Sequence, residues 1–322
     1  MSGIRDHAEG DGQVEQNPTR GYILVIAAAL LWASSGTAGK YLFHTGLPPF
    51  ALIYSRVILS SLILLVTFVL FNRRLLKIRI GDLPYFIILG SVVTALVQSS
   101  YFFAISKIQV AAAILLQYLA PILVALFSML FWKERPSAVK FLALFLALAG
   151  CYLVVGGYNI ELLKMNRAGI AWGMTSAVAF ASYTLMSERG MHRYSPWTVI
   201  FYAVFFATVS LSFFGSPLRY LTASYDTLQI TCVLYVAVMG TILPFGLYLA
   251  GINHIRSTRA IITATLEPIS AALIAFLVLG ETFEPLQILG GLLVIAAITS
   301  LQVQREYDEL APVLIRGRNE TN

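Results

Sequence analysis

The sequence predicts an all-α membrane protein of ten transmembrane helices, arranged as two inverted five-helix repeats with both termini in the cytoplasm. Three observations predict this fold. Of the 322 residues, 58% are hydrophobic and only 12% are charged, whereas soluble domains carry about 25% charged residues. Most of the chain consists of apolar stretches of about 20 residues, the length of a helix that crosses a membrane. The second half of the sequence also resembles the first half.

The apolar stretches are separated by short polar segments that contain most of the Lys and Arg residues. The first five predicted helices cover residues 21–43, 50–71, 84–105, 110–131 and 137–156. The next five cover residues 167–188, 196–215, 228–250, 258–279 and 284–303. Short connections predict that consecutive helices are antiparallel neighbours. The expected domains are a disordered cytoplasmic tail (1–19), a first repeat (20–157), a second repeat (166–303) and a cytoplasmic tail (304–322).

The distribution of Lys and Arg predicts the orientation, because cytoplasmic connections are enriched in these residues. With a cytoplasmic N-terminus, sixteen of them lie on the cytoplasmic side and five on the other side, with Arg56 inside a helix. Both termini are therefore expected in the cytoplasm, and the chain is expected to be a multi-pass protein of the cytoplasmic (inner) membrane.

An internal repeat relates the two halves of the sequence. A shift of 147 residues places Tyr101 on Tyr248, and fifteen of the fifty pairs from Tyr101 through Gly150 are identical. The informative pairs are Pro121 with Pro268 and Glu134 with Glu281, because Pro and Glu are rare in or beside membrane helices. Each repeat has five crossings, an odd number, so the second repeat enters the membrane from the opposite side. Inverted repeats are typical of secondary transporters, which bind their substrates near the midplane between the repeats.

Composition and spacing argue against several partners and cofactors. The net charge of +6 comes from basic residues at helix ends, so nucleic acid is not an expected partner. Cys151 and Cys232 each lie inside an apolar stretch, which leaves no disulfide framework. The four His residues lack the spacing of a metal site, and no Gly-rich Lys loop is present for ATP. The expected partners are a small-molecule substrate and membrane lipid, without cofactor or metal. A monomer and a homodimer both remain open.

Several motifs resemble those of EamA-type transporters of the drug/metabolite transporter superfamily. They are LWASSGTAGK at residues 31–40, Pro49 followed by Arg56, Leu119-Ala120-Pro121 through Ser137, and Leu266-Glu267-Pro268 through Glu281. They follow the family order over nearly the whole chain. The resemblance implies ten helices around a central cavity, with exporters of amino acids and metabolites among the relatives. Gln98, Tyr101, Gln117 and Tyr118 depart from the more apolar family pattern. The first three of these are candidates for the substrate cavity.

Two prolines and one carboxyl group are the strongest candidates for a role in transport. Pro121 and Pro268 lie near the middle of the fourth and ninth predicted helices, where each removes a backbone hydrogen bond. Paired helix breaks are typical of transporter binding sites, although packing alone also permits prolines in membrane helices. Glu267 is the only acid predicted deep in a membrane helix, where its burial costs about 3 kcal/mol. It is therefore a candidate for proton coupling, or alternatively a structural hydrogen-bond partner.

Further candidates for the substrate cavity share helix faces or carry charge. Thr263 and Ser270 lie four residues before and three residues after Glu267, and so on the same face of a regular helix. Trp32 with Ser35, and Trp172 with Tyr183, give the first and sixth helices an aromatic face, which packing alone also explains. Arg56 either extends to the membrane interface or pairs with a carboxylate.

The favoured function is a secondary active transporter of small metabolites or amino acids. It is expected to be an exporter that works by alternating access with proton coupling or exchange. The first alternative is an intramembrane enzyme acting on lipid-linked substrates, but the clustered acids or nucleophile–base pair that it needs are not evident. The second is a channel, which the missing pore-loop repeat disfavours.

Overall fold

The computed structural model of the chain describes residues 16–108, 110–132, 137–158, 166–214, 226–279, 284–303 and 310–321. Within these ranges every regular element is a helix, which confirms the all-α prediction. Residues 1–15 of the expected N-terminal tail lie outside the described residues, as do Glu134 and Glu281.

The helices of the first half follow the predicted ranges. α1 begins at Pro18, inside the segment expected as a tail, and the third predicted helix is one rod made of α3, the π-helix η3 and α4. The bounds are Pro18–His44 (α1), Pro49–Phe71 (α2), Arg73–Leu76 (η1), Ile80–Asp82 (η2), Leu83–Ile88 (α3), Leu89–Thr94 (η3), Ala95–Ile105 (α4), Val110–Gln117 (α5), Ala120–Phe131 (α6) and Ala138–Val154 (α7).

The helices of the second half also lie near the predicted ranges, except that α12 continues through residues 251–257, which were expected to connect two helices, and that one more helix follows. The bounds are Arg167–Met191 (α8), Pro196–Leu211 (α9), Thr227–Ala237 (α11), Val238–Ile242 (η5), Leu243–Thr263 (α12), Leu266–Leu279 (α13), Pro285–Val303 (α14) and Pro312–Thr321 (α15). The segment η5 is again a π-helix inside a longer rod. π-Helical turns inside α-helices frequently mark functional sites.

Polar residues at the helix starts explain where several helices begin. Asn17, Ser137 and Ser195 each accept a hydrogen bond from a backbone N–H in the first turn of α1, α7 and α9. Asp226 and Gln229 form a reciprocal capping box at the start of α11. These side chains satisfy N–H groups that have no partner within the helix.

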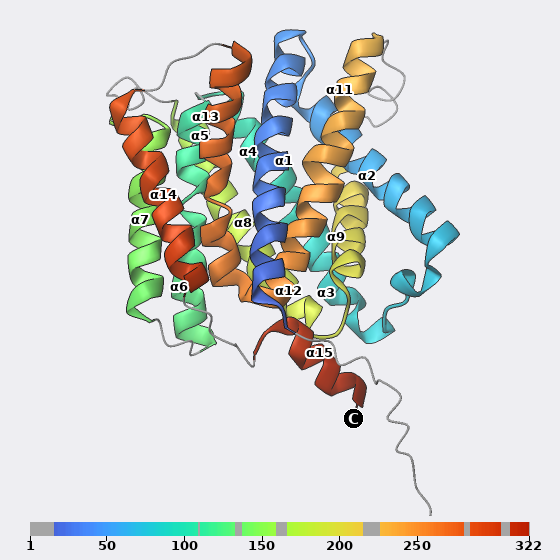
Figure 1. The fold of residues 1–322 in the computed structure, drawn as a ribbon. Helices are drawn as coiled ribbons and strands as arrows, with labels where there is room; N and C mark the ends of the chain where they lie inside the picture. Colours follow the sequence, from blue (N-terminus) through green and yellow to red (C-terminus); the bar gives the residue numbers. More distant parts are fainter. Residues whose placement is uncertain are drawn as a thin grey trace, which may run out of the picture.

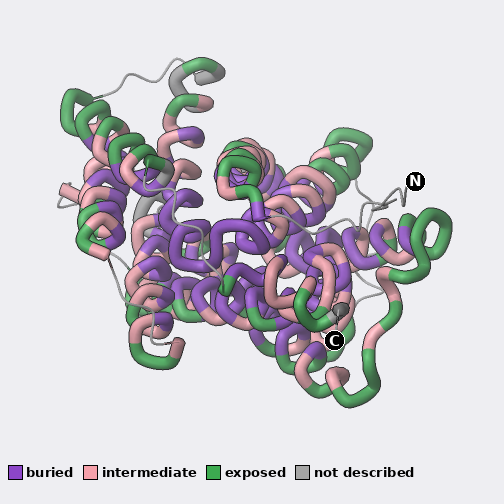
Figure 2. The backbone as a smooth tube through the Cα atoms, turned by 60° about the horizontal axis from the view of Figure 1, so that its bottom comes forward, coloured by how far each residue is buried: buried purple, intermediate pink, exposed green. Residues whose placement is uncertain are grey.

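The helices run roughly side by side in one bundle, with α7 packed against α14 and α1 packed against α12 (Figure 1). Glycines permit both close approaches. A Cβ atom on Gly150 would lie 2.6 Å from the backbone oxygen of Gly290, and one on Gly251 would lie 2.9 Å from that of Gly21. Buried residues concentrate along the middle of the bundle and exposed residues on its outer side (Figure 2). Small residues at helix contacts are typical of membrane bundles.

The outer surface is apolar, as expected for contact with lipid. Exposed side chains include Phe71, Leu130, Phe145 and Leu277, each at least 68% exposed. In the described part of the chain, five helical segments are long and apolar enough to cross a membrane: Pro18–Phe43, Pro49–Phe71, Ile80–Ile105, Ala113–Phe131 and Thr227–Thr263. Three shorter apolar helices accompany them: Ala138–Val154, Pro196–Leu211 and Pro285–Leu301. The chain is thus a helical protein with several membrane-spanning segments.

Both halves contain an interrupted helix. Residues 118–119 separate α5 from α6, and residues 264–265 separate α12 from α13. A second irregularity lies within α12, where Arg256 has φ 65° and ψ 168°. This left-handed backbone is strained for a residue with a side chain. The chain therefore turns sharply at Arg256 between two helical segments.

The two ends of the described chain meet the same end of the bundle. The amide of Gln16 donates to the backbone oxygen of His254 at 2.7 Å. Arg316 of α15 donates to the backbone oxygens of Met191 and Tyr194, both at 3.0 Å. α15 therefore lies across the lower end of the bundle in Figure 1. This helix lies in the segment 304–322, for which the sequence predicts only a tail.

Candidate functional site

A cavity between helices of both halves of the chain brings together most of the candidate residues. It has about 560 Å³ of space not filled by protein atoms, including space open to solvent. Seven candidates from the sequence line it: Trp32, Ser35, Arg56, Gln98, Tyr101, Gln117 and Glu267. The other lining residues are Gly36, Val97, Phe102, Phe180, Gly240 and Phe245. The lining includes α1, α2, α4 and α5 from the first half and α8, α12 and α13 from the second.

Arg56 on α2 supplies the positive charge of the cavity lining. Its side chain is buried, with the residue 6% exposed. One guanidinium nitrogen, Nη2, donates to the backbone oxygen of Gln98 at 2.9 Å and to the side-chain oxygen of the same residue. The guanidinium carbon lies 4.4 Å from the centre of the Phe102 ring, which is a cation–π distance. The expectation that Arg56 extends to the membrane interface is therefore wrong, because its charged end is held inside the bundle.

Glu267 supplies the carboxyl group of the lining, from the first turn of α13. The hydroxyl of Tyr118 lies 2.9 Å from Glu267 Oε2 and also 2.9 Å from the backbone oxygen of Ala264. Tyr118 and Ala264 belong to the two helix breaks, so one hydroxyl connects both interruptions to the carboxyl group. The N-terminal end of a helix also stabilises negative charge.

Aromatic rings form much of the remaining wall. Trp32 contacts Phe245 with ring centres 5.0 Å apart and Phe180 with centres 5.9 Å apart, both edge to face. These rings give part of the cavity lining an apolar surface. Sequence reasoning missed Phe102, Phe180 and Phe245. Phe180 lies eight residues after Trp172 on the helix that was already predicted to have an aromatic face, which is a signal that was available.

Two glycines, Gly36 and Gly240, line the cavity, and neither places a side chain in it. A Cβ atom on Gly36 would meet no atom within 4 Å, whereas one on Gly240 would lie 2.8 Å from Ser35. Gly240 belongs to the π-helix η5, so this irregular turn brings its backbone against α1 beside the cavity. The cavity therefore depends on small residues as well as on the polar ones.

Four candidates lie elsewhere. Trp172 packs on Phe103 with ring centres 5.0 Å apart, and Tyr183, 1% exposed, packs edge-on against Phe245 outside the lining. The hydroxyl of Thr263 donates to the backbone oxygen of Arg259, and that of Ser270 donates to that of Leu266. The expectation for Thr263 assumed a regular helix from Thr263 to Glu267. The break at residues 264–265 invalidates this assumption.

The two prolines mark the restart of each interrupted helix. Pro121 lies in the first turn of α6 and Pro268 in the first turn of α13. The first turn is the part of a helix that tolerates proline, because its N–H groups have no partner within the helix. The helices are therefore interrupted just before each proline, not bent at it. The amide of Gln117, the last residue of α5, donates to the Ser176 hydroxyl at 2.8 Å.

A buried ion pair lies at the end of the bundle near α15. Arg256 Nε is 3.0 Å from Glu188 Oε1, and Glu188 Oε2 accepts the backbone N–H of Ser257 at 2.7 Å. The side chain of Glu188 is 1% exposed. Burial, together with the charges of Arg256 and Arg189, lowers the pKa of His192 to about 4, so this histidine is neutral at physiological pH. Sequence reasoning missed this pair because its partners are 68 residues apart.

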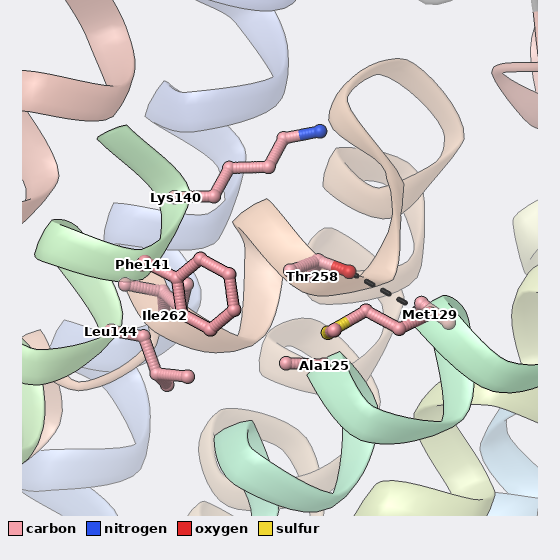
Figure 3. Close-up of a pocket in the computed structure, with 8 residues that line it drawn as sticks. Ala125, Met129, Lys140, Phe141, Leu144, Thr258 and Ile262 are labelled. Carbon is pink, nitrogen blue, oxygen red and sulfur yellow. Dashed lines mark hydrogen bonds between the residues drawn. The ribbon is translucent and has the colours of Figure 1, made fainter. Parts of the chain in front are cut away.

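A second, mostly apolar cavity lies between α6, α7 and α12. Figure 3 shows Ala125, Met129, Phe141, Leu144 and Ile262 around it. Lys140 extends along one side, and the Thr258 hydroxyl lies 3.4 Å from that of Ser128. None of the candidates from the sequence lines this cavity.

Comparison with known proteins places this architecture in one family. The EamA-like transporter family matches the chain twice, at residues 19–156 and 167–301. The uncharacterized inner membrane transporter YicL of Salmonella typhimurium is 31% identical over 87% of this chain and 94% of its own length. The threonine/homoserine exporter RhtA of Escherichia coli is 25% identical over 88% of this chain and 92% of its own length.

A solved crystal structure shares the fold, with a TM-score of 0.71 and 17% sequence identity over 88% of this chain and 97% of that one. The family and these relatives are transporters, which excludes the intramembrane enzyme considered above. The chain belongs to the EamA-like transporter family and is a multi-pass transporter of the inner membrane.

Proposed function

We propose that the chain is a secondary active exporter of small metabolites or amino acids that works by alternating access, coupled to protons or to exchange. The observation that carries this proposal is the cavity that holds a cation, Arg56, and a carboxyl group, Glu267, beside aromatic rings. Such a site complements a solute that has charged groups of both signs and an apolar part. The threonine/homoserine exporter among the relatives supports this class of solute and the outward direction.

Alternating access needs two halves that rock around a common site, which ten helices in two inverted repeats would provide. In this proposal the repeats are residues 20–157 and 166–303, with both termini in the cytoplasm. Four features support it. The family matches once in each half, each half has a π-helix, each has an interrupted helix, and the basic residues gather on one side.

Glu267 is the proposed proton site, and the support is a shared hydroxyl. Tyr118 carries one hydroxyl proton but lies within hydrogen-bond distance of both Glu267 and the Ala264 carbonyl. When Glu267 is ionised, Tyr118 donates to its carboxylate and the carbonyl loses this donor. When Glu267 is protonated, it donates to Tyr118, which then donates to the carbonyl. Protonation therefore changes the hydrogen bonding at the break between α12 and α13.

Two other polar residues in the surroundings of Glu267 are Tyr101 and Cys151, and neither exchanges a proton in the proposed cycle. Tyr101 lines the same cavity as Glu267 and Arg56. Cys151 packs beside Tyr118. Of these groups, only the carboxyl group of Glu267 gains and loses a proton in the proposed cycle.

Counterflow in proteoliposomes tests this proposal. Proteoliposomes that contain the purified protein are loaded with an unlabelled amino acid. Uptake of the labelled form is then measured for a panel that includes L-threonine and L-phenylalanine. Wild type and Glu267→Gln are compared at two pH values, with and without a pH gradient. The proposal predicts that both proteins exchange at least one solute and that only wild type accumulates it with the gradient.

Other results would contradict parts of the proposal. Entry of solute without stimulation by the internal pool would indicate a channel. Full gradient-driven accumulation by Glu267→Gln would remove the coupling role of this residue. No movement of any solute would reject the proposed substrate class.

A further inference from the structure

Two hydrogen-bond donors on residues that line the cavity lack an acceptor among the described residues. They are Nε of Arg56 and Nε2 of Gln98. Both residues are buried, at 6% and 1% exposed. More than nine in ten buried polar groups have a partner, so two unpaired donors on adjoining side chains require an explanation.

The two side chains are fixed relative to each other. Both oxygens of Gln98 accept from Nη2 of Arg56, so the amide is oriented with its oxygen toward the guanidinium. The face of Phe102 lies against the guanidinium on another side. Reorienting either residue to satisfy its free donor would break these contacts. The unpaired donors are therefore a preformed feature of the wall.

We propose that Arg56 and Gln98 form a carboxylate-binding subsite, so that the solute carried by this protein has a free carboxylate. This inference rests on the proposed transport function and names the group that the cavity recognises. A carboxylate has two acceptor oxygens, which match two donors, and its charge pairs with the guanidinium. A water molecule would satisfy the donors but would bring no negative charge to the guanidinium of Arg56, which has no carboxylate within salt-bridge distance among the described residues.

The rest of the lining narrows the class of solute. Glu267 lies in the same cavity, so a second negative charge on the solute would be repelled when this carboxyl group is ionised. A positively charged amino group would instead be attracted to it. The aromatic wall of Trp32, Phe180 and Phe245 accommodates an apolar side chain. The subsite therefore favours a zwitterion with a single carboxylate over a phosphate ester or a dicarboxylate.

Binding to the full-length protein in detergent tests the subsite directly. The probes are two pairs that differ only in the carboxylate: L-threonine with L-threoninamide, and L-phenylalanine with L-phenylalaninamide. Ligand-dependent thermal stabilisation gives an apparent affinity for each probe. The measurements are made at pH 6.5, where the amino groups of all four probes are mostly protonated.

The variants are Arg56→Gln, which removes the charge, and Gln98→Met, which removes the amide donor and keeps the arginine. Arg189→Gln is the control, because Arg189 is exposed and does not line the cavity. In wild type and the control, we expect the acid of at least one pair to bind at least about tenfold more tightly than its amide, the effect of a charge-assisted hydrogen bond. In the two cavity variants this ratio falls to about threefold or less.

Three results would overturn the subsite: equal binding of acid and amide by wild type, no binding of either member of both pairs, or an undiminished preference for the acid in both cavity variants. The second variant keeps the test decisive if Arg56→Gln fails to fold. The counterflow experiment separates this inference from the proposed function. Exchange without preference for the acid would reject the subsite alone, whereas preference for the acid without exchange would reject the carrier alone.

Discussion

The hydroxyl of Tyr118 lies 2.9 Å from both the Glu267 carboxyl group and the Ala264 carbonyl. We predict that Tyr118→Phe slows gradient-driven transport by about 5- to 100-fold, because a buried partner loses a hydrogen bond worth about 1–3 kcal/mol. Initial rates in proteoliposomes measure the effect. Tyr183→Phe is the matched control and should stay near the wild-type rate, since the buried Tyr183 hydroxyl has no hydrogen-bond partner among the described residues. Wild-type rates in Tyr118→Phe would show that the shared hydroxyl has no part in coupling.

For single residues, the sequence was most informative where a polar side chain interrupts an apolar helix. Arg56, Gln98 and Gln117 stood out for this reason, and all three line the cavity. Phe180 and Phe245 did not stand out, because an aromatic residue that lines a cavity has the same local pattern as one that packs against a neighbouring helix. Only the three-dimensional arrangement distinguishes the two.

The ion pair of Glu188 with Arg256 holds the sharp turn within α12. Breaking a buried pair by removing one partner leaves the other charge unpaired, at a cost of about 3–5 kcal/mol. We predict that Glu188→Gln lowers the melting temperature of the purified protein in detergent. Asp82→Asn is the control, because the Arg193–Asp82 pair is partly exposed, at 59% and 21% of each side chain. Such pairs contribute about 0–1 kcal/mol. Equal melting temperatures for the two variants would contradict this account of the turn.

The contact between α7 and α14 depends on Gly290 but not on Gly291. A Cβ atom on Gly290 would lie 2.7 Å from the backbone oxygen of Gly150, whereas one on Gly291 would approach nothing closer than 4.0 Å. Gly290→Ala should therefore destabilise the protein by about 1–3 kcal/mol through overpacking. Gly291→Ala should be neutral or stabilising, because alanine favours helix. Thermal unfolding compares the two, and equal stability would show that the helices can separate without cost.

The sequence predicted the helices and their approximate ends, because apolar length and capping residues are local properties. It also indicated the two interrupted helices through Pro121 and Pro268. The turn at Arg256 was not predictable in this way. A left-handed backbone usually requires glycine, and here contacts with Glu188, distant in the sequence, stabilise an arginine in that conformation. Thr263 was misplaced for a related reason, since Pro268 indicated an interruption but not that the helix would stop at residues 264–265, ahead of Glu267.

For the whole molecule, composition alone predicted the membrane environment, and the repeat predicted where the site would form. Seven of the residues selected from the sequence line one cavity. The residues around this cavity belong to helices from both halves of the chain. The sequence did not predict the packing of α15 against the lower end of the bundle. This contact depends on Arg316 reaching backbone oxygens at Met191 and Tyr194, which no periodic pattern records.

The central claim is that this cavity opens in turn to each side of the membrane. Ser35 lines it, so Ser35→Cys, in a chain with Cys151 and Cys232 replaced by alanine, places one thiol there. The measurement is labelling by a membrane-impermeant maleimide in membrane vesicles of both orientations, with and without L-threonine. The account predicts labelling from either side and a change in the ratio of the two rates when a transported solute binds. Labelling from one side only, under every condition, would contradict alternating access.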